Sequence, residues 1–315
     1  MPLIAAIIAL FLLGGCAPQP PAPASPSISV TRQDDGFMVR EADRPVLFYR
    51  LAPKSLDGKY ERSNYIHPLY GLDGEILTED FPEDHYHHRG VFWTWHQVLI
   101  GDVRAGDPWL AQRFSWQVQD ASVLPSGNGV RAVHRWFSPD FEQGAEPILE
   151  ETAEVSVAPA EADAQLIDFD IRLAALQDGV RLGGSEDDKG YGGFSVRVKV
   201  LPGLRFTAAA GAVEPTRRAL DAGDWVDFSG GFGPEPRASS GVAVLVHPTS
   251  AGYPQKWVLR AAATPSMQNP VWPGPAAVAV PLGQIVRLRY RLVIHRGDAS
   301  QVDLGALAAA YIAIP

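Results

Sequence analysis

Apolar and polar residues alternate along much of the chain, which is the pattern of β-strands that bury one face and expose the other. The segment 165–176 is the clearest case. One of its faces is apolar and the other is charged, with Ile167, Phe169, Ile171 and Leu173 set against Asp168, Asp170 and Arg172. Less regular runs predict further strands at 28–30, 37–39, 46–51, 91–100, 114–123, 129–137, 148–157, 194–200, 225–228, 241–246, 257–261 and 285–294.

Helical periodicity is expected at one place, near the end of the chain. Within Asp303–Ile314, apolar residues recur at helical spacing, at Leu304, Leu307, Ala308 and Tyr311. The 30 glycines and 27 prolines fall largely at the edges of short apolar runs, where they mark turns. Many short strands with few short helices predict an all-β protein, a large antiparallel β-sandwich. We expect residues 28–315 to form a single domain.

The N-terminal segment carries an export pattern. An apolar run at 3–13 is too short to span a bilayer as a mature helix, and it leads into Gly14-Gly15-Cys16. Small residues before a lone cysteine resemble a bacterial lipobox. This predicts a signal peptide over 1–16, lipidation of Cys16, and a tether rich in proline, alanine and serine over 17–27.

The alternative is an ordinary cleaved signal peptide with an incidental cysteine. Both interpretations predict an extracytoplasmic protein. The lipobox adds a membrane partner, because a lipid anchor would hold the protein in the bacterial cell envelope, in the periplasm or at the outer membrane.

Composition excludes several kinds of chemistry. Cys16 is the only cysteine, so the sequence has no internal disulfide, thiolate metal site or cysteine nucleophile. The net charge is −9 and no basic patch is visible, which argues against a nucleic-acid partner. The motifs of elbow-type serine hydrolases, zincin proteases and Rossmann dehydrogenases are absent from the sequence.

Five of the eight histidines lie between residues 65 and 97, among several carboxylates and aromatic residues: His67, His85, His87, His88 and His96. Histidine changes its charge near neutral pH, and a neighbouring carboxylate fixes its tautomer. This density therefore predicts a polar site. An extended backbone at 91–97 would place Val91, Trp93 and Trp95 on one face, toward the core, and His96 on the other face, toward a site or solvent.

The expected roles follow from the chemistry of each side chain. Proton transfer is expected from four residues: His67, Asp84, His85 and His87. Substrate contacts are expected from residues that offer charge, hydrogen bonds or a flat ring: His88, Arg89, Trp93, His96, Asp188, Lys189 and Trp257. Each has a plainer interpretation, which is a solvated loop for the charged residues and the core for each tryptophan.

The same histidines raise the question of a metal. In an extended segment His85 and His87 share a face, so a divalent metal at the histidine cluster is an open alternative. Neither their spacing nor the nearby ligand types match a diagnostic metal motif. We therefore assign no metal ligand and predict no cofactor.

Several strings together resemble the bacterial secreted family labelled "methane oxygenase PmoA-like", a domain of unknown function. They are Tyr65-Ile66-His67-Pro68-Leu69-Tyr70-Gly71, Thr78-Glu79-Asp80-Phe81-Pro82, Asp84-His85, His87-His88-Arg89-Gly90, Lys189-Gly190-Tyr191-Gly192-Gly193, Trp225-Val226-Asp227-Phe228-Ser229-Gly230 and His247-Pro248. The label does not suit the chain, because a membrane methane monooxygenase subunit needs several spanning helices, and nothing after residue 13 is long and apolar enough.

The resemblance implies a galactose-mutarotase-like supersandwich, in which a histidine acts as general acid and a carboxylate as base around a sugar ring. His67, His85 or His87 would then be the acid. Asp84 and Asp188 both qualify as the carboxylate, and neither sits in a recognisable mutarotase motif.

These observations favour an extracytoplasmic carbohydrate-active enzyme that cleaves a glycosidic linkage, by hydrolysis or elimination, with histidine and carboxylate groups moving protons. Two other classes remain open. One is a non-catalytic carbohydrate-binding lipoprotein, and the other is an oxidoreductase with a metal held by the histidines.

Overall fold

The computed structural model describes residues 27–315 apart from 200, 202, 233–238 and 262–265. The expected signal peptide, Cys16 and nearly all of the expected tether lie outside the described residues. Among the described residues, no helix has the length and apolar character that crossing a membrane requires.

Two large antiparallel sheets form the body of the molecule. The first sheet has eight strands, in the order β1 (Ile28–Gln33), β2 (Gly36–Glu41), β3 (Arg44–Arg50), β6 (Tyr65–Leu69), β7 (Val91–Thr94), β15 (Gly193–Val196), β21 (Ser266–Val271) and β20 (Lys256–Ala261). The second has nine, in the order β10 (Ser115–Val123), β11 (Gly129–Phe137), β12 (Leu149–Val157), β13 (Ala164–Ala175), β23 (Ile285–Arg296), β19 (Ser240–Val246), β18 (Trp225–Gly230), β16 (Arg205–Ala208) and β17 (Gly211–Val213).

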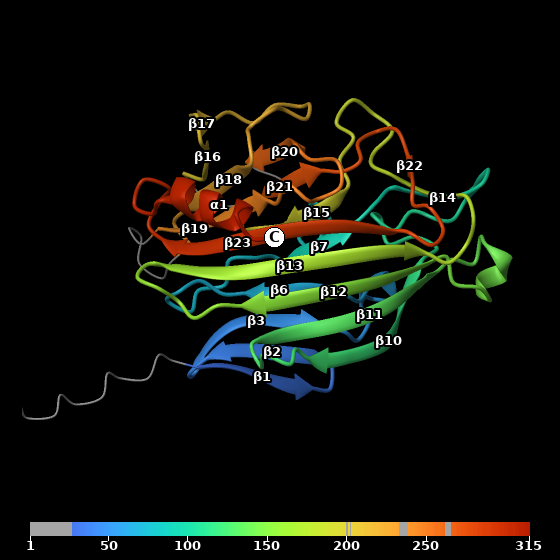
Figure 1. The fold of residues 1–315 in the computed structure, drawn as a ribbon, viewed down its shortest axis with the longest axis horizontal. Helices are drawn as coiled ribbons and strands as arrows, with labels where there is room; N and C mark the ends of the chain where they lie inside the picture. Colours follow the sequence, from blue (N-terminus) through green and yellow to red (C-terminus); the bar gives the residue numbers. More distant parts are fainter. Residues whose placement is uncertain (1–26, 200, 202, 233–238, 262–265) are drawn as a thin grey trace, which may run out of the picture.

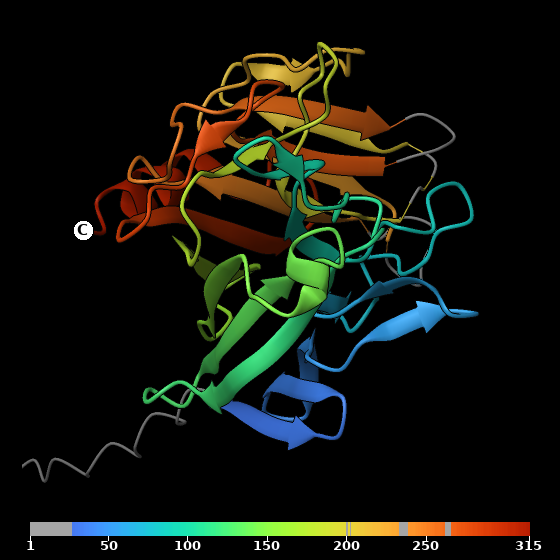
Figure 2. The ribbon, with the colours of Figure 1, turned by 90° about the vertical axis from the view of Figure 1, so that its right-hand side faces the viewer.

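Smaller elements complete the fold. A four-stranded sheet has the order β22 (Val278–Ala279), β14 (Val180–Gly183), β8 (Gln97–Ile100) and β9 (Val103–Arg104), and a hairpin pairs β4 (Lys54–Leu56) with β5 (Lys59–Arg62). A 3-10 turn, η1, spans Glu142–Gly144, and α1 spans Leu304–Ile312. Figure 1 shows the second sheet in front, from β10 to β23, with β6 and β7 behind it. Figure 2 looks onto the end of the sandwich at which β14 and β22 lie.

The core lies between the two large sheets, and strand alternation explains how it is filled. In β13 the residues Ile167, Phe169 and Ile171 are buried, and the charged residues between them are half-buried on the other face. Trp93 and Trp257 of the first sheet meet them in the same cluster. The structure confirms the predicted antiparallel all-β sandwich.

The predicted C-terminal helix is confirmed as α1. The Asp303 carboxylate accepts a hydrogen bond from the Ala306 N–H at 2.9 Å and caps the first turn. Leu304, Ala308 and Tyr311 pack with Trp225, Ala243, Leu245 and Val293 of the second sheet, in a small cluster apart from the main core. Figure 1 shows α1 beside β19 and β23 of that sheet.

The predicted single strand at 91–100 is wrong, because the structure divides it into β7 and β8, which belong to different sheets. The break lies at Trp95 and His96. The Trp95 indole is buried and donates to the Trp272 carbonyl at 2.9 Å, while the His96 carbonyl accepts from Arg104 at 3.0 Å. Strand β14 was not expected from the sequence, and β15 ends at Val196, before the predicted end of its segment.

The face of the first sheet that points away from the main core carries a second apolar layer. We call it the outer cluster, and it consists of Tyr65, Phe92, Trp109, Val258, Met267 and Val271. Alternation places the strand residues of this cluster there, because their neighbours Ile66, Val91, Trp93 and Trp257 point into the main core, and Trp109 comes from the β9–β10 loop. The loops that cover the outer cluster carry most of the predicted site residues.

Candidate functional site

A cavity of about 260 Å³ lies over the outer cluster. Its walls come from two strands and three loops: His85, His87 and His88 from the β6–β7 loop, Leu110 from the β9–β10 loop, Lys189 and Tyr191 from the β14–β15 loop, and Val258, Arg260 and Met267 from β20 and β21. Val258 and Arg260 are two residues apart in a strand, so they share the outward face. The lining therefore combines apolar side chains from the sheet with imidazole rings and two cationic side chains.

Two successive turns bring the three histidines together. The His85 N–H donates to the Pro82 carbonyl at 2.9 Å, and the His88 N–H donates to the His85 carbonyl at 2.8 Å. The ring centroids of His85 and His88 lie 4.8 Å apart and those of His87 and His88 lie 4.6 Å apart. The segment is therefore not extended as expected, and all three rings line one cavity.

Burial keeps two of these rings uncharged. It lowers the pKa of His87 to about 3 and holds the pKa of His88 well below its ordinary value, with the neighbouring cationic and imidazole groups adding to the effect. At neutral pH both rings are neutral, with one donor and one acceptor nitrogen each, and the Nδ1 of His88 accepts from Arg197 at 3.4 Å. They are suited to hydrogen-bonding a polar ligand rather than to carrying positive charge.

His85 is oriented by a carboxylate. Its Nδ1 lies 3.0 Å from an Asp84 oxygen, and the ring is partly exposed. Arg197, which is fully buried, donates to both Asp84 oxygens at 2.7 and 3.2 Å. Burial opposes ionisation of Asp84, but the hydrogen bonds from Arg197 and His85 outweigh it and lower the pKa of the carboxyl. Asp84 thus stays ionised and leaves Nε2 of His85 as the free ring nitrogen.

An aromatic wall stands beside the histidines. The rings of His96 and Trp109 stack at 5.3 Å, and Tyr191 meets them edge-on at 5.1 and 4.9 Å. His96 Nδ1 lies 2.9 Å from Asp107, and its buried Nε2 has no hydrogen-bond partner among the described residues. Burial raises the pKa of Tyr191, so its phenol is protonated at neutral pH. His96 was expected to face a site, and it supports the wall without lining the cavity.

The two cations of the lining have different partners. Lys189 Nζ pairs with Asp187 at 2.8 Å. Arg260 donates to the carbonyls of Thr216, Leu259 and Arg217 at 2.6, 2.8 and 3.2 Å. Neither Asp nor Glu is among the residues that line the cavity.

His67 lies apart from this group. Its Nδ1 is 3.0 Å from the Thr78 hydroxyl, and burial lowers its pKa to about 4. Its nearest charges are those of Asp80, Lys54, Arg89 and Lys199. The structure does not bring His67 into the lining of the cavity.

Arg89 is committed to the protein rather than to a ligand. Its fully buried guanidinium donates to Asp80 at 2.5 Å, to the Tyr65 hydroxyl at 2.6 Å and to the Tyr60 carbonyl at 2.9 Å. These bonds tie the β6–β7 loop to the β4–β5 hairpin. The structure thus corrects the expectation that Arg89 contacts substrate.

The expectation that Trp93 and Trp257 stack on a sugar is also wrong. Both rings are fully buried in the main core, on the inward face of the first sheet. Trp93 Nε1 donates to Glu151, and Trp257 Nε1 donates to the Gly223 carbonyl at 2.8 Å. Neither ring has a face to offer a sugar, because β-strand alternation turns Phe92 and Val258 outward instead.

Asp188 is an exposed residue that pairs with Arg218 at 2.6 Å and does not line the cavity. Its neighbour Lys189 does. The sequence reasoning missed Leu110, Val258, Arg260 and Met267, and it quoted Tyr191 without assigning it a role. The alternation around Trp257 was the available signal, since a buried Trp257 implies that Val258 and Arg260 face the other way.

Within the part of the chain that the structure describes, no group of three or more His, Cys, Asp or Glu side chains is arranged to hold a metal ion. The three clustered histidines contact one another by their ring faces and edges.

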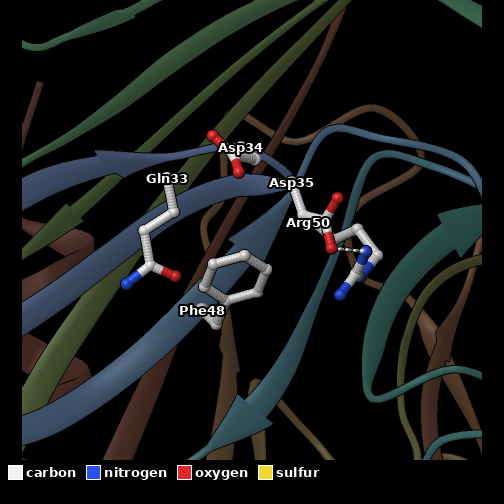
Figure 3. Close-up of a pocket in the computed structure, with 5 residues that line it drawn as sticks. All are labelled: Gln33, Asp34, Asp35, Phe48 and Arg50. Carbon is white, nitrogen blue, oxygen red and sulfur yellow. Dashed lines mark hydrogen bonds and ion pairs between the residues drawn. The ribbon is translucent and has the colours of Figure 1, made fainter.

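A second cavity, of about 410 Å³, lies at the turn between β1 and β2 (Figure 3). Its lining is Gln33, Asp34, Asp35, Phe48 and Arg50. The Arg50 guanidinium is paired with Asp35 at 3.1 Å, and the side chains of Gln33 and Asp34 point in different directions around the Phe48 ring. It holds no histidine and no convergent pair of unpartnered groups, so the histidine-lined cavity is the better candidate.

Comparisons with known proteins give a family and distant structural likenesses. No curated protein matches the chain. A candidate mutarotase (YeaD) from Salmonella typhimurium aligns at a TM-score of 0.35 and 12% identity, over 87% of this chain and 95% of that one. The GH36 alpha-galactosidase AgaA from Geobacillus stearothermophilus aligns at a TM-score of 0.29 and 8% identity, over 86% of this chain and 41% of that one. Neither score reaches 0.5, and the fold described above rests on the strands of this chain alone.

The sequence model of one protein family matches residues 37–309, which include every strand from β3 to β23 and the whole candidate site. The PmoA-like label is not among these findings. The chain belongs to the family described as "Family of unknown function (DUF6807)".

Proposed function

We propose that the chain is an enzyme that cleaves a glycosidic linkage of a carbohydrate by acid–base chemistry in the histidine-lined cavity. The observation that carries the proposal is the Asp84–His85 pair. A carboxylate held ionised by Arg197 fixes His85 Nδ1 and leaves Nε2 free at a cavity. That arrangement is the one general acid–base catalysis needs.

The cavity suits a sugar in its surface chemistry. A pyranose has apolar C–H faces and a rim of hydroxyls, and the cavity sets Val258, Leu110 and Met267 beneath polar groups of the histidines and Lys189. Tyr191 takes the part that the sequence reasoning gave to tryptophan, because it is a partly exposed ring in the lining. The volume of about 260 Å³ is just below the ~300–1,000 Å³ of typical ligand sites, which favours a single ring or one chain end.

Other residues around the cavity bind the substrate or hold His85 and Asp84 in place in this proposal. Neutral His87 and His88 hydrogen-bond substrate hydroxyls. Arg197, which directly follows β15, positions Asp84 and also donates to Glu79 at 2.9 Å, so it holds the β6–β7 loop against the end of β15. The expected lipid anchor at Cys16 remains a proposal drawn from the lipobox-like sequence. It would place this cavity outside the cytoplasm, where polymeric carbohydrate is encountered.

The test is turnover on a panel of neutral and acidic oligosaccharides, followed by the release of new chain ends. Wild type and Asp188→Asn, whose substituted residue lies just outside the cavity, are expected to cleave the same substrate. His85→Ala is expected to bind it and to lose turnover. Saturable binding with no cleavage of any panel member by wild type would favour the non-catalytic binding protein instead.

A further inference from the structure

We propose that the substrate is an acidic sugar, a uronic acid residue within an oligosaccharide, and that cleavage is an elimination rather than a hydrolysis. This inference rests on the proposed function, since it names the substrate class and the reaction route at the same cavity. Three features of the lining carry it: its charged residues, its lack of carboxylates, and the presence of both histidine and tyrosine.

The charge of the cavity is opposite to that of the protein. The chain has a net charge of −9, whereas the charged residues of the lining are Lys189 and Arg260. Asp187 offsets Lys189, but the hydrogen bonds of Arg260 among the described residues go to carbonyl oxygens only. The Asp187 charge acts on Arg260 from a distance, but Arg260 forms no ion pair among the described residues, so its guanidinium can pair with a ligand carboxylate.

Hydrolysis by the usual route is a poor match to the lining. Most glycoside hydrolases place two carboxyl groups across the scissile bond, as acid and as nucleophile or base. Neither Asp nor Glu lines this cavity, and Asp84 is used by Arg197 and His85. The polar groups that line the cavity instead are three imidazoles, a phenol and two cations.

These groups supply each part of an elimination. His85 Nε2 takes the proton from the ring carbon next to the substrate carboxylate, and the electron pair of that C–H bond forms a carbon–carbon double bond. The C–O bond to the leaving sugar breaks, and its oxygen takes the proton of the Tyr191 hydroxyl. The products are an unsaturated uronide and a sugar with a new free hydroxyl. The imidazolium of His85 then gives up the proton that it gained, and the Tyr191 phenolate takes one up from solvent, so the enzyme returns to its starting state. No water, oxidant or cofactor is consumed.

Lys189 and Arg260 lower the barrier to the proton transfer from the ring carbon to His85. Removal of the proton develops negative charge on the carboxylate, and Lys189 with Arg260 stabilises that charge. The aromatic wall of His96 and Trp109 holds the Tyr191 ring in place, and burial keeps its phenol protonated as the acid requires.

The test compares an oligomer of a uronic acid with the matched neutral oligomer of the same linkage. Elimination is read from the ultraviolet absorbance of the conjugated product, and hydrolysis from reducing ends without that absorbance. We expect absorbance from the uronide alone. It is expected to fall by about a hundredfold or more in His85→Ala and Tyr191→Phe, from the usual contribution of acid–base groups.

Charge recognition is tested separately by calorimetric binding. Arg260→Gln is expected to weaken uronide binding by about tenfold or more, from the usual strength of charge-assisted hydrogen bonds, and Arg260→Lys to recover part of the loss. Arg217→Gln is the matched control, because its side chain is exposed and outside the lining and only its carbonyl binds Arg260. Unchanged unfolding temperatures establish that the variants are folded.

The outcomes separate the two proposals. Cleavage of the neutral oligomer, lost in His85→Ala and without absorbance, would leave the proposed function in place and overturn the uronide and the elimination. Uronide binding that depends on Arg260, with no product of either kind from wild type, would overturn the proposed function and the elimination together. Equal binding of a sulfated neutral oligomer would overturn the assignment of the anion as a carboxylate.

Discussion

Histidine and carboxylate side chains lie together in several regions of this molecule, and two of these regions differ in their access to a cavity. On the outer face of the first sheet, His85 lines the candidate site and Asp84 holds its ring from behind the lining. Between the sheets, Glu151 of β12 faces His134 of β11 in the cross-strand register, and both are fully buried. The same residue types therefore serve as candidate chemistry in one of these regions and as internal structure in the other.

The interior pair is defined by its partners. Glu151 accepts hydrogen bonds from the indoles of Trp93 and Trp136 and from the Asn64 amide, while burial raises its pKa to about 7. His134 has no partner for either ring nitrogen among the described residues, and burial lowers its pKa to about 3. Access and partners thus distinguish a site from a core, whereas residue type does not.

The largest expected effect is on the turnover number, and it concerns the cavity region only. If the proposed function holds, His85→Ala should lower the turnover number by about 10²–10⁴-fold, the usual contribution of a general acid–base group. The free energy of unfolding should change by less than about 0.5 kcal/mol, because the ring is partly exposed. Steady-state kinetics and denaturant unfolding measure the two quantities. A loss of turnover matched by a loss of folded protein would contradict the assignment.

The second prediction concerns the interior region and removes the carboxylate of Glu151. Glu151→Ala leaves two indole N–H groups and one amide N–H without their acceptor inside the core, so we expect a loss of about 3 kcal/mol or more of unfolding free energy. Turnover per folded molecule should be retained. Denaturant unfolding of this variant beside Glu150→Ala, the half-buried neighbour on the opposite face, measures the difference. Equal losses in the two variants would count against the role of the buried acceptor.

The interior histidine gives a pH dependence of known sign. The pKa of His134 is about 3 in the folded state against 6.5 for the free side chain, so the unfolded chain binds the proton first as pH falls. Stability is therefore lost between about pH 6.5 and 3 from this group, by about 2 kcal/mol at pH 5 relative to neutral pH. His134→Leu should remove this part of the slope and be at least as stable at pH 7. Parallel slopes for wild type and His134→Leu would refute the burial of an uncharged ring.

The smallest expected effect is that of changing Asp188, which lies just outside the cavity. Asp188 forms an exposed ion pair with Arg218, and surface pairs contribute about 0–1 kcal/mol. Asp188→Asn should therefore leave turnover, and the unfolding free energy to within about 0.5 kcal/mol, as in wild type. A marked loss of turnover would return Asp188 to the substrate contacts that the sequence predicted. It would also move the boundary of the site.

The fold was predictable from the sequence because strand alternation is a local signal. The pattern at 165–176 gives β13, and the spacing of Leu304, Ala308 and Tyr311 gives α1. The end of β7 was not predictable. It depends on the turn of Trp95 into the core and of His96 toward Asp107, and those contacts come from distant segments.

The candidate site was predictable in part, because the histidines that line it are close together in the sequence. The density of histidines identified His85, His87 and His88, and their carboxylate neighbour Asp84. Arg260 was missed because nothing in one strand reveals which loops cover its outward face. Trp93 was misassigned although its predicted place on the aromatic, inward face already argued for the core. Alternation carries more weight than residue type when the two disagree.

The most direct test of the central claim is a structure of His85→Ala determined with a bound uronide oligomer, since that variant is expected to bind without turnover. We expect the sugar over Val258 and beside Tyr191, with its carboxylate at Arg260. A sugar bound instead at the turn between β1 and β2 (Figure 3), or at another face of the molecule, would contradict the assignment of the histidine-lined cavity as the active site.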